Sequence, residues 1–363
     1  MLFRVVLGLC ILVLAISTVS VIMWDLPVSN LEVAPRLQLE RRSVDYGPLT
    51  TELTQQNFAQ LDQQANNFRH KELWYLGGLS TLDNFYDTVS IYYLPAPKST
   101  LPVFETTLAR LNQWHKERPN SLAARVALAY IWERRAWEFR GSDSVDKVTP
   151  AQWLKVADAL KTATGYLQGI RPEDDAMSLS VWMDIEWLEG DFDGGQKSFR
   201  QIQSIYPHFY EPYQTEVRMF YPQWYGSPEI LAEFLTSLGK PTASTDQLIA
   251  YSYVAQSEYT LGRCCESPAK ALLDWSAIQR GFAARASQYG LRHPDWNTLL
   301  NMAIGYGDCE VAEEAIVHIG DQWDPNVWGT KAAYDANVDW VRKHEQLVPA
   351  LIGRVRALWS LRK

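Results

Sequence analysis

The stretch of the sequence that comes nearest to a small metal site is LEGDFDGGQKSFRQIQSIYP, residues 188–207. Two aspartates, Asp191 and Asp193, stand there among three glycines, as carboxylates do in a calcium-binding loop. In a 12-residue calcium loop that starts at Glu189, the last position requires a bidentate glutamate, but Arg200 occupies it. We therefore predict no metal site. The pattern is typical of a tight turn between two packed helices.

Paired carboxylates on candidate helices are the other residues that could do chemistry, because glycosidases act through two acidic side chains. Asp184 with Glu186, and Glu133 with Glu138, form such pairs, but spacing alone favours neither. The six histidines show no zinc-binding spacing, and the sequence has no nucleophile-elbow, phosphate-binding or dinucleotide-binding motif. We expect no cofactor and no catalytic activity.

Composition restricts the class of protein. The chain has 363 residues, 47% of them hydrophobic and 21% charged, as in an ordinary globular protein. A net charge of −8 argues against nucleic-acid binding, which needs a surplus of lysine and arginine. The 15 tryptophans are expected to pack between helices, with sugar stacking as the alternative.

Residues 5–24 form an uninterrupted apolar run without a charged side chain. Twenty residues of helix span the roughly 30 Å hydrocarbon core of a bilayer. Arg4 precedes the run and Asp25 follows it, which favours an N-terminus in the cytoplasm and the remainder outside. We predict a single-pass anchor in the inner (cytoplasmic) membrane with a periplasmic domain. A signal peptide cleaved near residues 15–17 is the alternative.

The exported part would carry three cysteines in an oxidising compartment. Cys264 and Cys265 are adjacent, and a bridge between neighbours is strained, so Cys309 with one of them is the favoured disulfide. Three buried thiols are the alternative.

Helical signals dominate beyond the first 50 residues. Apolar residues recur at helical spacing from Trp153 to Leu167, behind Thr149 as an N-cap, Pro150 at the first helical position and Gln152 for a capping box. Glycines follow many such runs, as helix C-caps do. The only short strand candidate, VSIYYL at residues 89–94, also fits a helix end. The pattern predicts an all-α protein.

Residues 176–207 resemble one tetratricopeptide repeat, a 34-residue helix–turn–helix unit. Leu179 and Trp182 match the first helix, Phe199 matches the second, and the turn lies at residues 190–192. Glycine and alanine are expected where Met183, Gly195 and Ile202 stand, so the unit is degenerate. A second degenerate unit begins near His293, and residues 114–130 are weakly similar.

The segments RAWEFRG (residues 135–141) and YPQWYGSPEILAEF (residues 221–234) are similar to a bacterial family of tetratricopeptide-like domains of unknown function. That resemblance would cover most of residues 50–330. It implies a helical solenoid and brings no activity with it.

The tetratricopeptide resemblance also implies where a partner would bind. In such repeats the first helix lines a concave surface, and its lining positions fall here on Asp184, Trp187, Asn297 and Asn301. A tryptophan could anchor an apolar side chain, and asparagines could hydrogen-bond an extended peptide. The alternative is that Trp187 belongs to the core and that the asparagines solvate a helix.

We therefore expect an all-α, helix–turn–helix solenoid that acts as a membrane-anchored interaction module for a protein or peptide. The alternative is an exported carbohydrate-active enzyme on an α/α toroid, although repeat lengths of 31–35 residues favour the solenoid. The C-terminal helix is expected to cap the solenoid, or alternatively to contact anionic lipid. The expected parts are an anchor (residues 1–24), a linker (25–50), the helical domain (51–345) and the capping helix (346–363).

Overall fold

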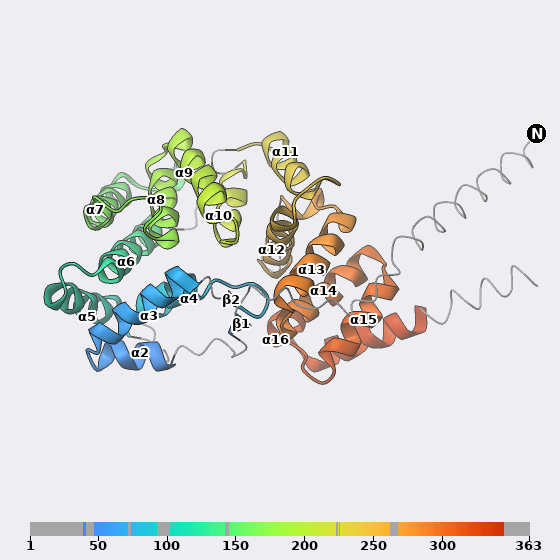
Figure 1. The fold of residues 1–363 in the computed structure, drawn as a ribbon. Helices are drawn as coiled ribbons and strands as arrows, with labels where there is room; N and C mark the ends of the chain where they lie inside the picture. Colours follow the sequence, from blue (N-terminus) through green and yellow to red (C-terminus); the bar gives the residue numbers. More distant parts are fainter. Residues whose placement is uncertain are drawn as a thin grey trace, which may run out of the picture. The chain divides into compact units, whose positions relative to one another are not determined.

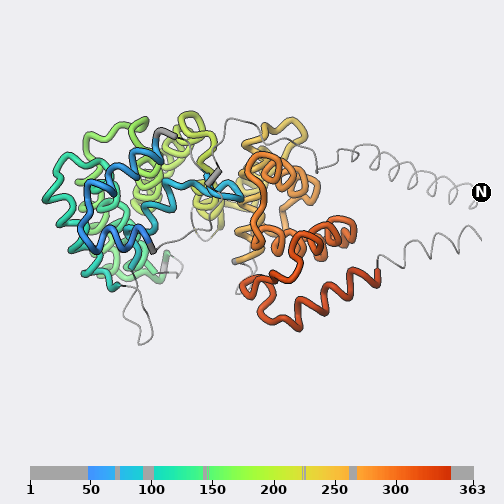
Figure 2. The backbone as a smooth tube through the Cα atoms, turned by 60° about the horizontal axis from the view of Figure 1, so that its bottom comes forward, coloured from blue at the N-terminus to red at the C-terminus, as the bar shows by residue number. Residues whose placement is uncertain are grey.

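The part of the protein that the structure describes is helical, as the sequence predicts, apart from one pair of two-residue strands (Figures 1 and 2). The computed structural model describes residues 39–40, 47–71, 74–92, 102–141, 145–222, 224, 226–261 and 268–344. The strands β1 (Leu39–Glu40) and β2 (Trp74–Tyr75) pair in parallel. The helices are α2 (Gly47–Thr54), α3 (Phe58–Lys71), α4 (Thr81–Val89), α5 (Phe104–Glu117), α6 (Leu122–Arg140), η2 (Val145–Lys147), α7 (Pro150–Leu167), α8 (Ala176–Glu189), α9 (Phe192–Ile205), α10 (Pro212–Met219), α11 (Pro228–Gly239), α12 (Thr245–Leu261), η3 (Lys270–Leu272), α13 (Trp275–Tyr289), α14 (His293–Tyr306), α15 (Cys309–Ile319) and α16 (Pro325–Trp328).

Several predicted features fall outside the described residues. These are the apolar run 5–24, most of the linker, the adjacent cysteines Cys264 and Cys265, and the capping helix 346–363. Within the described ranges, every helix is too short or too polar to cross a membrane. Helix α2 already begins at Gly47, inside the segment expected to be a linker.

Helix boundaries follow the local signals in the sequence. Thr149 caps α7 and forms the predicted capping box with Gln152, with the two side chains bonding each other's backbone N–H groups. The side chain of Ser227 caps α11 by accepting a hydrogen bond from the N–H of Ile230 (3.3 Å). The strand candidate at residues 89–94 is described as far as residue 92, and that part is the end of α4, at Val89, followed by residues outside any strand.

The opening stretch is a turn, as predicted. Gly190 adopts the left-handed conformation that ends α8, and the side chain of Asp191 caps α9 by accepting a hydrogen bond from the N–H of Gly194 (3.0 Å). Gly307 and Asp308 form the same kind of turn between α14 and α15. Both segments that resemble tetratricopeptide units are therefore helical hairpins.

Helices α4, α6, α8 and α10 contact one another in succession, and we call them the central row. Helix α3 packs on α4, both α5 and α7 pack on α6, and α9 packs on α8 (Figure 1). The buried apolar core lies between these helices and includes the fully buried rings of Trp114 and Phe85. Tryptophan thus packs between helices in this part of the chain, as composition predicts.

A turn after β2 joins this half of the chain to the later helices. The carbonyl oxygen of Gly77 accepts hydrogen bonds from Arg285 Nε (2.5 Å), on α13, and from the hydroxyl of Tyr253, on α12. Arg285 also forms an ion pair with Asp295, on α14, at 2.9 Å, and both side chains are 0% exposed. Gly77 has a positive φ of 80°, and a Cβ there would lie 2.6 Å from the Asp295 carboxylate. This turn can therefore be built only with glycine.

Candidate functional site

The structure separates the four residues predicted to line a groove. Asp184 and Trp187 lie on α8, whereas Asn297 and Asn301 lie on α14. Trp187 is only 1% exposed, and its ring packs edge-on against Phe192 at 5.1 Å. A side chain buried in this way stabilises the hairpin and does not present a surface to a partner.

Asn297 is a structural residue as well. Its side chain is 0% exposed and donates to the carbonyl oxygens of His293 (2.7 Å) and Gln322 (3.0 Å). Its Oδ1 accepts from the indole of Trp328 (2.8 Å) and the N–H of Asp324 (3.1 Å). All its hydrogen-bonding capacity is therefore used within the protein. Asn301 is half-buried on the same helix, and its predicted groove role stays a prediction.

Asp184 differs from the other three because it belongs to a group of acidic side chains on the central row. The group, which we call the carboxylate cluster, consists of Asp83 and Asp87 on α4, Glu133 on α6, Asp184 on α8, Glu216 on α10 and Glu211 at the start of α10.

At one end of the cluster, carboxylates from α4 and α10 come together. Burial raises the pKa of Asp83 well above its usual range, and the charge of Glu211 raises it further. Glu211 accepts a hydrogen bond from the N–H of Ser80 (3.0 Å), but burial still raises its pKa. Asp87 is balanced by Arg134, whose Nη1 lies 2.5 Å from its Oδ1. This end therefore holds one compensated carboxylate and two that interact with each other.

In the middle of the cluster, Glu133 and Asp184 interact across α6 and α8. Burial raises the pKa of Glu133 well above its usual range, and the neighbouring Asp184 raises it further. Burial raises the pKa of Asp184 to about 7, although the charge of Arg218 acts in the opposite direction. Both carboxyl groups therefore hold their protons more tightly than exposed carboxyl groups do, and Asp184 exchanges its proton near neutral pH.

Glu216 closes the cluster on α10 and is 2% exposed. Burial raises its pKa to about 8, while Arg200 and the indole of Trp187 act in the opposite direction. Its Oε2 is buried without a hydrogen-bond partner in the described structure, and the same is true of Asp184 Oδ1 and Glu211 Oε2. Buried polar atoms are normally paired, so these three oxygens leave acceptor capacity that a ligand could use.

At the end of α6, a contact between two tryptophans joins the two segments on which the family resemblance rests. The rings of Trp137, from the first segment, and Trp224, from the second, meet edge-on at 5.4 Å. The guanidinium of Arg140 lies over the Trp224 ring at 3.9 Å, a cation–π contact. The two segments therefore form one packed feature, although they are far apart in the sequence.

The acidic pairs considered from the sequence are rearranged in space. Glu186 accepts a hydrogen bond from Ser198 (2.6 Å), and Glu138 forms an ion pair with Arg135 (2.6 Å). The two carboxyl groups that interact are instead Glu133 and Asp184, which come from different predicted pairs. The only signal in the sequence is that each follows two apolar residues, in IWE and WMD, and spacing cannot show that the two stretches meet.

The described residues contain no group of three or more histidine, cysteine, aspartate or glutamate side chains that could hold a metal ion. The carboxylate cluster can instead accept hydrogen bonds, bind a positive charge or exchange protons near neutral pH.

In comparison with known proteins, one family model matches part of the chain. Residues 51–181 match a family model described as "Domain of unknown function (DUF4034)". The matched range includes α3 to α7 and the first residues of α8, so it contains Glu133 but neither Asp184 nor Glu216. No curated protein and no solved structure matches the chain. The family match agrees with a helical domain of unknown function, and it leaves the tetratricopeptide resemblance as an interpretation.

Proposed function

We propose that this protein is a helical interaction module whose carboxylate cluster receives a basic side chain of a protein or peptide partner. The observation that carries the proposal is the set of buried carboxylate oxygens without hydrogen-bond partners, on Asp184, Glu211 and Glu216. Asp184 and Glu216 lie on helices that contact one another, and their charges interact.

A lysine or arginine side chain fits this arrangement because it offers several N–H donors and a positive charge. Such a ligand would favour the ionised form of each carboxyl group it contacts. Since the pKa of Asp184 is about 7 and that of Glu216 about 8, binding near neutral pH would release protons. Affinity for a basic ligand should therefore rise between pH 6 and 8.

The tetratricopeptide-like hairpins and the membrane anchor belong to the same proposal. Residues 5–24 would hold the module at the inner membrane, with the helices on the periplasmic side. Alkaline extraction of membranes tests the anchor, because an integral protein stays in the membrane fraction. Release into the supernatant, or a mature N-terminus near Thr18, would exclude it.

Fluorescence anisotropy of labelled decapeptides tests binding at the cluster. The probes are one peptide with arginines, one with citrullines at the same positions and one with glutamates. We expect the arginine peptide to bind most tightly to the full chain, and Asp184→Asn to weaken binding at least tenfold, or about 1.4 kcal/mol.

Glu189→Gln is the matched control, because Glu189 lies at the exposed end of the same helix. It removes the same charge and should leave the affinity unchanged. Equal binding of the arginine and citrulline peptides, or an equal loss in both variants, would contradict a charge-specific site. Circular dichroism of each variant shows whether the helices are intact.

One observation favours a second candidate function. Glu133 and Asp184 form an interacting pair of carboxyl groups, and a glycosidase uses such a pair, with a raised pKa on the one that acts as general acid. The alternative is thus a carbohydrate-active enzyme. Incubation with a panel of bacterial polysaccharides tests it, since an enzyme would release reducing ends and both Glu133→Gln and Asp184→Asn would abolish this release.

A further inference from the structure

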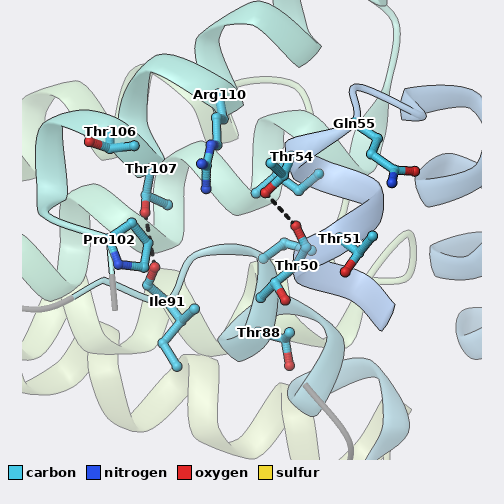
Figure 3. Close-up of a pocket in the computed structure, with 12 residues that line it drawn as sticks. Thr50, Thr51, Thr54, Gln55, Thr88, Ile91, Pro102, Thr106, Thr107 and Arg110 are labelled. Atoms are coloured by element: carbon cyan, nitrogen blue, oxygen red, sulfur yellow. Dashed lines mark hydrogen bonds between the residues drawn. The ribbon is translucent and has the colours of Figure 1, made fainter. Parts of the chain in front are cut away.

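A pocket of about 580 Å³ lies between α2, the end of α4 and the start of α5 (Figure 3). This volume is within the range of small-molecule sites. The pocket is separate from the carboxylate cluster and shares no residue with it. Its walls are formed by Thr50, Thr51, Leu53, Thr54, Gln55, Thr88, Val89, Ile91, Pro102, Thr106, Thr107 and Arg110.

The polar groups of the pocket have an unusual composition. Six of the lining residues are threonines, one is arginine, and none is aspartate or glutamate. Arg110 has no ion pair or hydrogen bond within the described part of the chain, and its guanidinium points into the space between Thr54 and Thr107 in Figure 3. An arginine held among neutral groups is a site for an anion, because guanidinium binds carboxylate and phosphate through two parallel hydrogen bonds.

The hydroxyl groups add a second requirement. The hydroxyls of Thr54, Thr88 and Thr107 each donate their only hydrogen to a backbone carbonyl, those of Thr50 (2.7 Å), Asn84 (2.6 Å) and Ile91 (2.9 Å). Their oxygens can therefore only accept further hydrogen bonds. Thr88 and Thr107 are buried, whereas Thr54 is exposed to the pocket. A ligand that bonds the Thr54 oxygen must carry a donor of its own, in addition to the negative charge that Arg110 requires.

We propose that this pocket binds a small polyhydroxylated organic anion, of the sugar-acid class. Arg110 holds its carboxylate, and the oxygen of Thr54, whose side chain is exposed, accepts a hydrogen bond from one of its hydroxyl groups. The half-buried side chains of Ile91 and Pro102 provide apolar surface for the face of a sugar ring. This site goes beyond the proposed function and does not depend on it.

Isothermal titration calorimetry of the full chain with glucuronate, glucose, acetate and inorganic phosphate tests the proposal. We expect glucuronate to bind at one site per chain and the other three probes to bind at least tenfold more weakly. Glucose lacks the charge, while acetate and phosphate lack the set of hydroxyl donors.

Two variants test separately the contact with the ligand's carboxylate and the contact with its hydroxyl groups. Arg110→Gln should weaken glucuronate binding at least tenfold, and Thr54→Val should weaken glucuronate without changing the weak binding of acetate. Lys116→Gln is the matched control, because Lys116 is an exposed cation farther along α5 and does not line the pocket.

Unchanged melting temperatures would show that the variants are folded, as expected for side chains near the surface of the pocket. The proposal is overturned if glucuronate does not bind, or if Arg110→Gln and Lys116→Gln have equal effects. Phosphate or acetate binding as tightly as glucuronate would show a simple anion site and exclude the sugar-acid class.

Discussion

Glu216→Gln should make the protein less sensitive to pH. The substitution keeps the size and shape of the side chain but removes the group that ionises. Glu216 is 2% exposed, so the folded protein gains little from hydration of its charge. The native structure must therefore tolerate a buried carboxylate at high pH, whereas the variant has none.

The size of the effect follows from the pKa. Burial raises the pKa of Glu216 from 4.5 to about 8 in the folded protein. Between these values the folded protein holds a proton that the unfolded chain has released, so the free energy of unfolding falls as pH rises. The loss is about 1.4 kcal/mol per pH unit, and at most about 5 kcal/mol over the whole interval. Below pH 4.5 the residue is protonated in both the folded and the unfolded protein, so it no longer lowers the free energy of unfolding.

The assay is urea unfolding of the full chain at pH 5, 6, 7 and 8, in a mild detergent and followed by far-ultraviolet circular dichroism. The free energy of unfolding of Glu216→Gln should exceed that of the unmodified protein by an amount that grows with each pH step. The exposed Glu189→Gln serves as the control and should show no such trend. Parallel pH profiles for Glu216→Gln and the unmodified protein would refute the reasoning.

Three other substitutions test the fold. Asp191→Ala removes the cap of α9 and should lower stability by about 1 kcal/mol, measured by urea unfolding; no loss would show that the turn is held by other contacts. Asn297→Ala should lower the free energy of unfolding by about 2 kcal/mol or more, because the Trp328 indole loses its buried acceptor. A loss of peptide binding without a loss of stability would instead support the predicted groove role of Asn297. Arg285→Gln should lower the free energy of unfolding by about 3 to 5 kcal/mol, because the buried Asp295 carboxylate loses one of the positive charges that balance it. A change below about 1 kcal/mol would contradict a stabilising role of this ion pair.

The sequence alone determined the helical class and many helix ends. The capping box of Thr149 and Gln152 involves groups only three residues apart, and the Gly190–Asp191 turn is likewise local. Such signals can be read without the rest of the protein because their partners are adjacent in the chain. They established the hairpins but not the faces that the hairpins bury.

Only the tertiary structure decided the environment of each side chain. Trp187 was expected to line a groove and is buried, because α9 packs on the face that carries it. Glu133 and Asp184 interact across two helices, and Arg285 reaches Gly77 from α13. A pKa or an ion pair depends on desolvation and charge contributed by distant segments, and hydrophobic periodicity does not specify which segments meet.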